Sequence, residues 1–412
     1  MKPLEICILG GGAAGFFAAL AAAETRRGLA ISILEKGPQF LAKVRISGGG
    51  RCNVTHTPGD VRAFAAAYPR GERALIGALQ RFQAADTIAW FETRGVQLKT
   101  QADGRVFPVS DSSQTIIDCL LTETQQAGVQ TLTRAGVEQI TRRENGPFEL
   151  TLSNGSTRTC DRLLLATGGC RTAAGAGLAV SLGHTLEPPV PSLFTFHVEE
   201  AWVRALAGIS VESVEASVPG LSLREQGPLL LTHWGLSGPV ILRLSAWGAR
   251  ALHGVNYACP LLINWLPDLN REQVTARLQA LSAQLPAKRI VNTAFHPLPG
   301  RLWEQLVRTA GISPETRWSA LSRSARHLLT EHLVRTSLTV TGKSTNKDEF
   351  VTCGGIPLRE VNFKTMESRV CPGLHFAGEL LDIDGITGGF NFQAAWTTGW
   401  IAGRAMAAGK PD

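Results

Sequence analysis

Hydrophobic residues near the N-terminus follow the order strand, turn, helix, strand. Residues 4–9 form an apolar run that predicts a buried strand, and the alanine-rich segment behind the turn at 10–15 predicts a helix. Residues 31–34 predict a second strand, with Glu35 at its end. This order predicts a βαβ unit that binds a dinucleotide.

The glycine-rich turn has the spacing of a pyrophosphate-binding loop. Gly10 allows the tight turn, Gly12 lets the backbone approach the phosphates, and Gly15 lets the helix pack on the strand. The N–H groups and dipole at the helix N-terminus then face the phosphates. We expect the Glu35 carboxylate to accept hydrogen bonds from both ribose hydroxyls of an adenosine, which disfavours a 2′-phosphate there. A glycine turn with a merely structural role is the alternative.

Two later segments resemble strand ends that meet a cofactor. Residues 163–165 predict a buried strand that ends in glycine turns at 168–169, although an ordinary strand end is the alternative. Residues 373–379 predict another strand, which ends at Glu379 and precedes a glycine-rich loop and a helix over about 392–408. Such an acid can bind a polyol, and such a helix N-terminus stabilises negative charge on a flavin ring. The pattern therefore favours FAD over NAD.

The middle of the chain changes character twice. Strand patterns occupy residues 193–198, 211–218, 261–265 and 336–341, whereas residues 271–285, 301–310, 316–321 and 324–334 have helical spacing. The sequence predicts an α/β fold in which a Rossmann-like FAD-binding domain is interrupted by an insert with a β-barrel-like part and a small helical subdomain. The predicted domains are 1–190 with 345–412, a β-rich insert domain at 191–267 with 336–344, and a helical insert subdomain at 268–335.

Composition limits the class of protein. A chain of 412 residues suggests two or three domains, and 44% hydrophobic residues is typical of globular folding. The eight cysteines include no C-x-x-C pair and no metal-ligand spacing, so we expect reduced thiols, no metal and a cytoplasmic location. Glu5 and the glycine motif argue against a signal peptide, and no apolar run is long enough to predict a membrane span.

Positive charge is concentrated in the predicted helical subdomain. The chain has a formal net charge of +7, and residues 268–335 contain ten Lys or Arg against five acids. On charge alone we favour a solvated basic face over a nucleic-acid surface.

Five motifs resemble those of one family of flavoproteins. They are KVRISGGGRCNVT at 43–55, GRVFPVS at 104–110, LTHWGLSGP at 231–239, VNFKTMES at 361–368, and the segment 376–391. The chain is similar throughout to the family of FAD-dependent oxidoreductases that includes RdsA, BaiN and aminoacetone oxidase. The resemblance implies the interrupted Rossmann-like domain described above. The sequence departs from the family pattern at Cys353, where Thr is common, and at Phe390, where Tyr is frequent. Both changes could alter the pocket above the flavin, so the family pattern does not identify the substrate.

The motifs and the resemblance together predict the cofactor contacts. These are Gly10, Gly12, Ala13, Ala14, Gly15, Glu35, Lys36, Lys43, Arg51, Cys52, Asn53, Ala166, Thr167, Gly168, Gly378, Glu379, Asp384, Gly388, Gly389, Phe390 and Asn391.

Family members are credited with reducing a uridine of ribosomal RNA, reducing bile-acid enones or oxidising aminoacetone. Reduction of a conjugated C=C bond requires hydride from reduced flavin and an acid that protonates the α-carbon. Cys52 is the first candidate acid, although the adjacent Arg51 is expected to lower the pKa of its thiol, and a small buried residue is the alternative. His233 is the second candidate, with a structural histidine as its alternative.

We expect an FAD-dependent oxidoreductase that reduces an activated C=C bond, with a uridine of ribosomal RNA as the leading substrate. The chain lacks a second glycine motif behind a strand, so NAD(P)H is expected to visit the flavin transiently. An RNA uridine reductase needs a groove lined by residues such as Arg323, Arg326 and Lys343. Three aromatic residues near that charge are candidates for stacking a base or for the core: Trp303, Trp318 and Phe350.

Two other enzymes and one protein without catalysis are the alternatives to an RNA uridine reductase. An enone reductase needs a closed apolar pocket, and an amine oxidase needs access for oxygen. The third alternative is a flavin-binding scaffold that catalyses no reaction. The oligomeric state is not predicted.

Overall fold

The computed structural model describes residues 3–142, 146–169, 173–344 and 351–408 of the chain. It contains two compact units. The sheet unit comprises Met1–Pro191 and Lys347–Asp412, and the barrel unit comprises Ser192–Asn346.

The sheet unit is built on a seven-stranded sheet. Its strands, in spatial order, are β19 (Val361–Asn362), β20 (Glu367–Ser368), β21 (Leu374–Phe376), β10 (Arg162–Leu165), β1 (Glu5–Leu9), β2 (Ala30–Leu34) and β6 (Gln130–Leu132). The five strands from β21 to β6 run parallel, so their carboxyl ends share one edge. The central strand β1 is buried from Ile6 to Leu9, because helices cover both faces of such a sheet.

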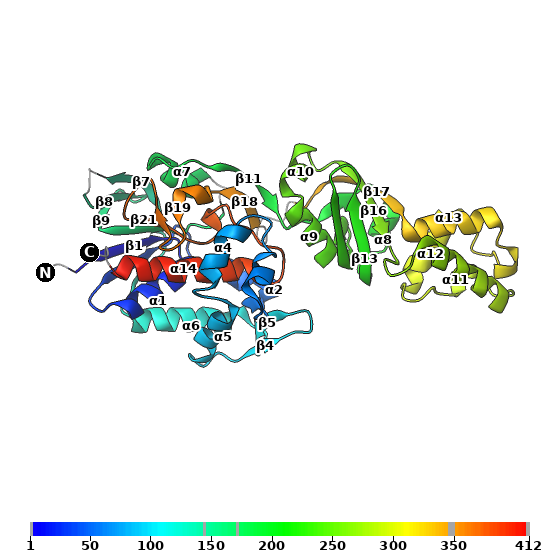
Figure 1. Cartoon of the computed structure of the whole chain (residues 1–412), viewed down its shortest axis with the longest axis horizontal. Coiled ribbons are helices and arrows are strands. Elements are labelled where there is room, and N and C mark those ends of the chain that lie inside the picture. Colours follow the sequence, from blue (N-terminus) through cyan, green and yellow to red (C-terminus); the bar gives the residue numbers. More distant parts are fainter. Residues whose placement is uncertain (1–2, 143–145, 170–172, 345–350, 409–412) are drawn as a thin grey trace. The chain divides into compact units, whose positions relative to one another are not determined.

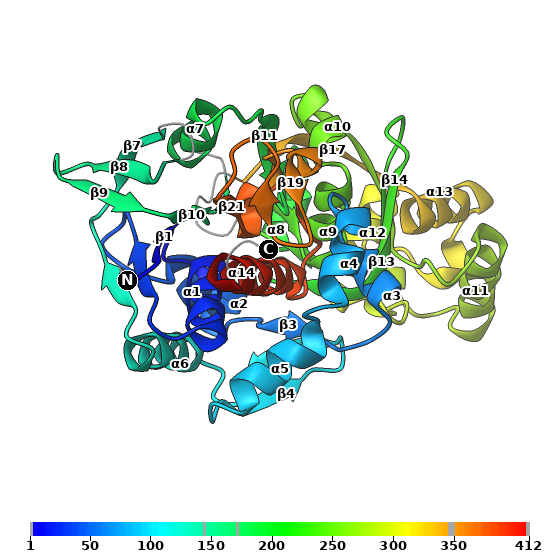
Figure 2. The same ribbon diagram turned by 60° about the vertical axis from the view of Figure 1, so that its left-hand side comes forward.

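Two helices far apart in sequence pack along one another in this unit. They are α1 (Ala13–Thr25) and α14 (Phe390–Ala408), side by side in both views (Figure 1, Figure 2). A Cβ on Gly399 would lie 2.5 Å from the carbonyl oxygen of Ala14, and one on Gly403 would lie 2.1 Å from that of Ala18. The glycines therefore allow the two helix backbones to touch, and the stretch of α1 from Ala14 to Ala22 is buried.

Smaller elements complete the sheet unit. The other strands are β3 (Thr55–His56), β4 (Leu98–Thr100), β5 (Arg105–Pro108), β7 (Val137–Arg142), β8 (Phe148–Leu152), β9 (Thr157–Cys160), β11 (Glu187–Ser192) and β18 (Val351–Gly355). The other helices are α2 (Ala42–Gly50), α3 (Val61–Ala65), α4 (Glu72–Leu79), α5 (Ala84–Glu92), α6 (Ser113–Gln126), α7 (Ala173–Ser181), and the 3₁₀ turns η3 (Leu358–Glu360) and η4 (Gly378–Leu380).

The barrel unit contains a closed six-stranded barrel. Its strands, in spatial order, are β12 (Phe196–Val198), β15 (Gly235–Ser237), β14 (Leu223–Leu231), β13 (Ser210–Val218), β16 (Cys259–Asn264) and β17 (Thr336–Lys343). Inward and outward side chains alternate along these strands, as in β13, where Ala216 and Val218 are buried and Ser217 is half-buried.

Helices make up the rest of the barrel unit. They are α8 (Ala201–Ala205), α9 (Pro239–Trp247), α10 (Ala249–Gly254), α11 (Arg271–Gln284), α12 (Gly300–Thr309), α13 (Arg323–Val334), and the 3₁₀ turns η1 (Ile290–Asn292) and η2 (Trp318–Ala320). In Figure 1, α11, α12 and α13 form a separate cluster at one end of the barrel. The α/β class and the inserted barrel with helices, expected from the sequence, are confirmed.

Two local expectations were wrong. The segment 316–321 forms only the short 3₁₀ turn η2 and not an α-helix, and residues 193–195 lie outside any strand. In segments as short as 316–321 and 193–195, the intrinsic helix or strand propensity of the residues is too weak to outweigh tertiary packing.

Candidate cofactor site

The carboxyl edge of the sheet brings the N-terminal glycine turn against the end of β10. A Cβ on Gly10, where φ is +114°, would lie 2.2 Å from the carbonyl oxygen of Ala166, and one on Gly15 would lie 2.0 Å from the carbonyl oxygen of Gly10. Only glycine fits at either position. The structure thus explains two glycines of the motif by close packing of strand, turn and helix.

The N-terminus of α1 has the properties of an anion site. Gly12 is the N-cap residue and no side chain caps it. A Cβ at Gly12 would meet nothing within 4 Å, and both Gly12 and Ala13 are half-exposed, whereas Ala14 is buried. Uncapped N–H groups beside open space, at the positive end of a helix dipole, fit the pyrophosphate of a dinucleotide.

Glu35 stands at the end of β2 beside this helix terminus. Its two carboxylate oxygens accept hydrogen bonds from the N–H of Gly11 at 2.8 Å and of Gly37 at 2.6 Å. The carboxylate is half-buried and retains free lone pairs, so it can also accept from ribose hydroxyls. The neighbouring Lys36 is exposed.

A second cluster joins Lys43 of α2, Thr352 of β18 and Glu379 of η4. Glu379 forms an ion pair with Lys43, and its other oxygen accepts from the N–H of Thr352 at 2.9 Å. The Thr352 hydroxyl is buried and has no hydrogen-bond partner among the described residues. A Cβ on Gly169 would lie 2.3 Å from Thr352 Oγ1 and 2.6 Å from Glu379 Oε1. An unpaired hydroxyl and a carboxylate, approached by a bare glycine, fit the polyol of FAD.

The segment behind α2 is held by its own packing. The Arg51 guanidinium lies 4.4 Å from the centroid of the Phe107 ring and donates to the Gly48 carbonyl at 3.2 Å. With its amide oriented to suit both neighbours, Asn53 donates to the Thr55 carbonyl and accepts from the Gly389 N–H, each at 2.9 Å. Asn53 therefore ties this segment to the loop before α14.

Cys52 is completely buried, and burial raises the pKa of its thiol to about 12, opposed by a hydrogen bond with Ser47. The expectation that Arg51 lowers this pKa is wrong. Desolvation of the thiolate outweighs the cation, because the guanidinium lies over Phe107. Cys52 is thus a neutral thiol at physiological pH.

The loop before α14 is fixed by two polar clamps. Asp384 is fully buried in a two-point ion pair with Arg70, one of whose contacts is 2.5 Å. The Asn391 amide accepts from the N–H of Gly385 at 2.8 Å and donates to its carbonyl at 2.9 Å. Asn391 thus binds the backbone of its own loop, whereas Asp384 ties the loop to Arg70, which precedes α4.

Aromatic packing fixes the end of the same loop. The Phe390 ring is stacked on His56 with 4.7 Å between centroids, and His56 donates to the carbonyl of Gly388 at 3.0 Å. A Cβ on Gly389 would lie 2.4 Å from the carbonyl carbon of Thr55. Phe390 is therefore part of a buried cluster, without the hydroxyl that Tyr would place there.

The remaining predicted contacts lie at the ends of β10 and β21. Ala166 is buried, Thr167 is exposed and Gly168 is half-exposed with φ of +77°, while Gly378 abuts the Cβ of Ala14.

In the barrel unit, His233 lies on the loop between β14 and β15 and is exposed. Arg323 is exposed and Arg326 half-exposed, and the Lys343 ammonium lies 5.2 Å from the centroid of the Tyr257 ring. The candidate roles of Trp303 and Trp318 as base-stacking surfaces are wrong. Both are buried in the helical core, with 6.4 Å between their rings, and Phe350 lies outside the described residues.

Sequence reasoning missed Thr352 and Arg70. Thr352 immediately precedes Cys353-Gly354-Gly355, and the glycine pair is a sequence signal that could have pointed to it. Both glycines have positive φ angles in the structure. Nothing near Arg70 signals its pairing with Asp384, which lies 314 residues away.

Two common features are absent from the described chain. None of its helices has both the length and the hydropathy needed to cross a membrane. It contains no group of three or more His, Cys, Asp or Glu that could hold a metal ion. Its seven cysteines are free thiols.

A parallel sheet with an uncapped helix N-terminus and a half-buried acid at its carboxyl edge is the arrangement expected of an FAD-dependent oxidoreductase. The family model described as HI0933-like protein Rossmann domain matches residues 4–405. The chain belongs to this family.

Curated relatives cover the chain from end to end. The protein named ribosomal RNA dihydrouridine synthase of Escherichia coli (strain K12) is 32% identical over 422 residues, with 100% of each chain covered. The protein of the same name from Haemophilus influenzae is 30% identical, with 96% of each chain covered. The protein named 3-dehydro-bile acid delta(4,6)-reductase of Clostridium scindens is 29% identical, with 98% of this chain and 99% of that chain covered.

Two solved structures share the fold. The 3-ketosteroid delta1-dehydrogenase of Sterolibacterium denitrificans has a TM-score of 0.53 at 12% identity, with 100% of each chain covered. The 3-ketosteroid-delta4-(5alpha)-dehydrogenase of Rhodococcus jostii has a TM-score of 0.51 at 13% identity, with 99% of this chain and 98% of that chain covered.

Proposed function

We propose that this enzyme reduces an activated C=C bond and that its substrate is a uridine of ribosomal RNA, which becomes dihydrouridine. The observation that carries the proposal is the full-length similarity, at 32% and 30% identity, to two proteins named ribosomal RNA dihydrouridine synthase. The exposed cations of the helical part of the barrel unit support it, because an RNA substrate needs positive charge to hold its backbone.

The chain's residues have separate tasks in this proposal. The N-terminus of α1 binds the pyrophosphate of FAD, Glu35 binds the ribose of its adenosine, and Glu379 with Thr352 binds its ribityl chain. Lys43 neutralises Glu379 and fixes its orientation. When bound and reduced, the flavin would supply hydride to the C=C bond. NAD(P)H is the proposed donor that visits the flavin transiently.

The proton for the substrate's α-carbon requires an acid that solvent can recharge. The exposure of His233 supports it in this role, whereas the complete burial of Cys52 supports a structural role for the thiol. Water is the third candidate.

The test is mass-spectrometric quantification of dihydrouridine in ribosomal RNA from cells with and without this protein. Cells lacking it are complemented with the wild type, Cys52→Ala or His233→Gln. We expect deletion to remove a dihydrouridine, Cys52→Ala to restore it and His233→Gln to restore little. An unchanged nucleoside profile on deletion contradicts the RNA substrate.

The 29% identical bile-acid reductase motivates a second candidate, a small conjugated enone. The purified holoenzyme, reduced anaerobically with NADH or NADPH, is mixed with ribosomal RNA from the deletion cells or with a 4,6-dienone steroid. Bleaching of the flavin absorbance identifies the donor, and its return identifies the acceptor. Rapid return with the steroid alone favours the second candidate.

A further inference from the structure

The outer surface of the barrel carries a row of side chains set by strand register. Ser217 of β13 pairs with Arg224 of β14 on one side and with Leu262 of β16 on the other. Leu262 in turn pairs with Ser337 of β17. Cross-strand partners point to the same face of a sheet, and the neighbours of Ser217 in sequence, Ala216 and Val218, are buried inside the barrel. The row therefore faces solvent.

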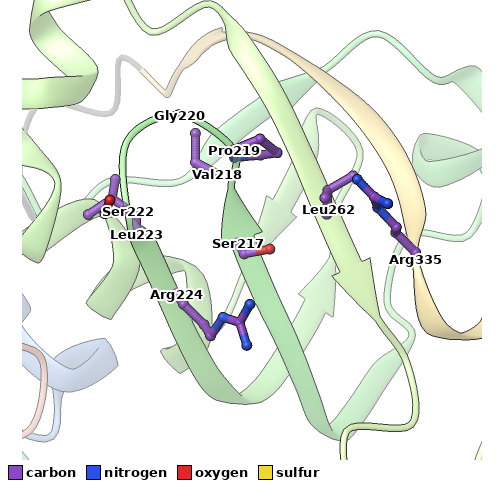
Figure 3. Close-up of a pocket in the computed structure, with 9 residues that line it drawn as sticks. All are labelled: Ser217, Val218, Pro219, Gly220, Ser222, Leu223, Arg224, Leu262 and Arg335. Carbon is purple, nitrogen blue, oxygen red and sulfur yellow. The ribbon is translucent and has the colours of Figure 1, made fainter. Parts of the chain in front are cut away.

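Three residues of this row, Arg224, Ser217 and Leu262, line an open pocket of about 370 Å³ (Figure 3). The β13–β14 turn, β16 and the end of α13 supply its lining, which comprises Ser217, Val218, Pro219, Gly220, Ser222, Leu223, Arg224, Leu262 and Arg335. Two guanidinium groups and two hydroxyls can all donate hydrogen bonds into it. The pocket lies entirely within the barrel unit.

The charge balance of the pocket is positive. The Arg224 side chain is 71% exposed and has one acidic neighbour, Glu215, at 3.4 Å. Arg335 is exposed, and its guanidinium forms no ion pair or hydrogen bond within the described chain. The exposed ion pair between Arg224 and Glu215 adds little to stability, so Arg224 can exchange it for a ligand. Arg335 has no such pair to give up in the part of the chain that the structure describes.

The helical cluster that ends at Arg335 extends this charge. Among its described residues, three acids pair with arginines: Glu304 with Arg308, Glu315 with Arg289 and Glu331 with Arg271. The cations outside these ion pairs are Arg277, Lys288, Arg301, Arg317, Arg323, Arg326 and Arg335. A long anionic polymer can contact the pocket and this cluster together, whereas a small phosphate would use the pocket alone.

We propose that the pocket binds a phosphodiester group of the RNA backbone. Arg224 and Arg335 hold the phosphate oxygens through their planar donors, the hydroxyls of Ser217 and Ser222 add further donors, and Leu262 offers an apolar surface to the adjoining sugar. This inference rests on the proposed function, since it takes RNA as the substrate. It assigns the phosphate contact to residues far from the cofactor motifs in sequence.

The test measures binding of the full-length holoprotein to a fluorescently labelled single-stranded oligouridylate over a range of salt concentrations. The variants are Arg224→Gln, Arg335→Gln and the double variant. One lost phosphate contact lowers the slope of log affinity against log salt by about 0.7 for single-stranded RNA, and two lower it by about 1.4. The matched control is Arg27→Gln, which removes the same charge from the exposed turn before β2, at the opposite edge of the sheet from the cofactor site.

A variant that removes a negative charge separates a loss of RNA recognition from damage to the fold. Glu215→Gln removes the acid beside Arg224, so we expect it to tighten binding, which an unfolded or disturbed barrel cannot do. If Arg224→Gln and Arg335→Gln bind RNA with the wild-type slope, or if Glu215→Gln weakens binding, the pocket assignment is overturned. Equal loss of slope in Arg27→Gln overturns it as well, since the charge effect would then be general. Competition by inorganic phosphate at equal phosphate concentration would assign the pocket to a small anion instead.

The outcome for the pocket is distinguishable from that for the proposed function. Dihydrouridine in ribosomal RNA of the deletion cells tests the function, and the salt slope tests the pocket. If deletion removes dihydrouridine but both arginine variants keep the wild-type salt slope, only the pocket assignment is contradicted. If dihydrouridine persists after deletion but the salt slopes fall, the proposed reaction is contradicted and RNA binding at the pocket is retained.

Discussion

Arg70 in the sheet unit and Arg224 in the barrel unit each lie beside one carboxylate, but their exposure to solvent differs. The Arg70 side chain is 17% exposed and its partner Asp384 is fully buried, whereas Arg224 is 71% exposed and Glu215 is 26% exposed. A buried pair must stay intact because either charge alone is costly, while an exposed pair exchanges readily with water or a ligand. Burial therefore separates an arginine that holds a loop from one that recognises a ligand.

The largest effect is expected at the buried pair. Arg70→Met leaves the Asp384 carboxylate without its partner, so we expect the free energy of unfolding of the sheet unit to fall by about 3–5 kcal/mol. Urea unfolding, followed by circular dichroism, measures it. The double variant Arg70→Met with Asp384→Leu removes both charges and should recover much of the loss. A double variant as unstable as the single one would contradict this explanation.

The next largest effect is expected at the glycine turn, where substitution of Gly10 should reduce the amount of bound FAD. Here the comparison is between a crowded backbone position and an open one. Gly10→Ala and Gly28→Ala both place a side chain at positive φ, which costs about 1–3 kcal/mol. Only at Gly10 would the new Cβ also meet a backbone oxygen at 2.2 Å, because Gly28 faces open space. We therefore expect Gly10→Ala to lose most of its bound FAD and Gly28→Ala to keep it. The ratio of flavin to protein absorbance in the purified proteins decides this.

A buried imidazole in the sheet unit predicts a dependence of stability on pH. Burial lowers the pKa of His375 to about 4, with Glu367 opposing the shift. Between pH 6.5 and 4 the unfolded chain takes up a proton that the folded chain does not, so stability falls as the pH falls through this window, by at most about tenfold in the folded-to-unfolded ratio per pH unit. His375→Gln should flatten the profile of urea midpoint against pH. The exposed His327 provides the control variant His327→Gln, which should leave the profile unchanged.

The smallest effect on stability is expected at the exposed pair. Arg224→Gln should change the free energy of unfolding by less than about 1 kcal/mol, because the ion pair with Glu215 is screened by water. Urea unfolding measures this as well. A loss as large as that of Arg70→Met would remove the distinction between the two arginines.

The parts of the fold that the sequence predicted are those in which backbone geometry dictates residue type. Gly10 and Gly15 are required by backbone contacts, and the strand, turn and helix around them follow in order. The helix expected at 392–408 is α14, which begins two residues earlier, at Phe390. By contrast, β14 was not predicted, since Gly227 and Pro228 interrupt the strand and its exposed positions include both polar and apolar residues.

The site was less predictable because side-chain contacts leave no local pattern. Lys43 and Glu379 were both expected to contact FAD, but only the structure shows that they pair with one another. The Cys52 pKa was misjudged since Arg51 is adjacent in sequence yet lies over Phe107, while burial acts on the thiol directly. The register of β13, β14 and β16 brings Arg224, Ser217 and Leu262 together, and Arg335 joins them in the pocket lining from the end of α13, which no motif records.

The contact between α1 and α14 has a consequence for the order in which the chain folds during synthesis. The barrel unit is one continuous segment, so it can fold as soon as it has emerged from the ribosome, while the sheet unit still lacks its last helix. Gly399 and Gly403 can meet the carbonyls of Ala14 and Ala18 only after α14 has been made. Helix α1 therefore remains without its partner while the barrel unit is translated, and a nascent chain stalled before α14 would leave the apolar surface of α1 available to chaperones.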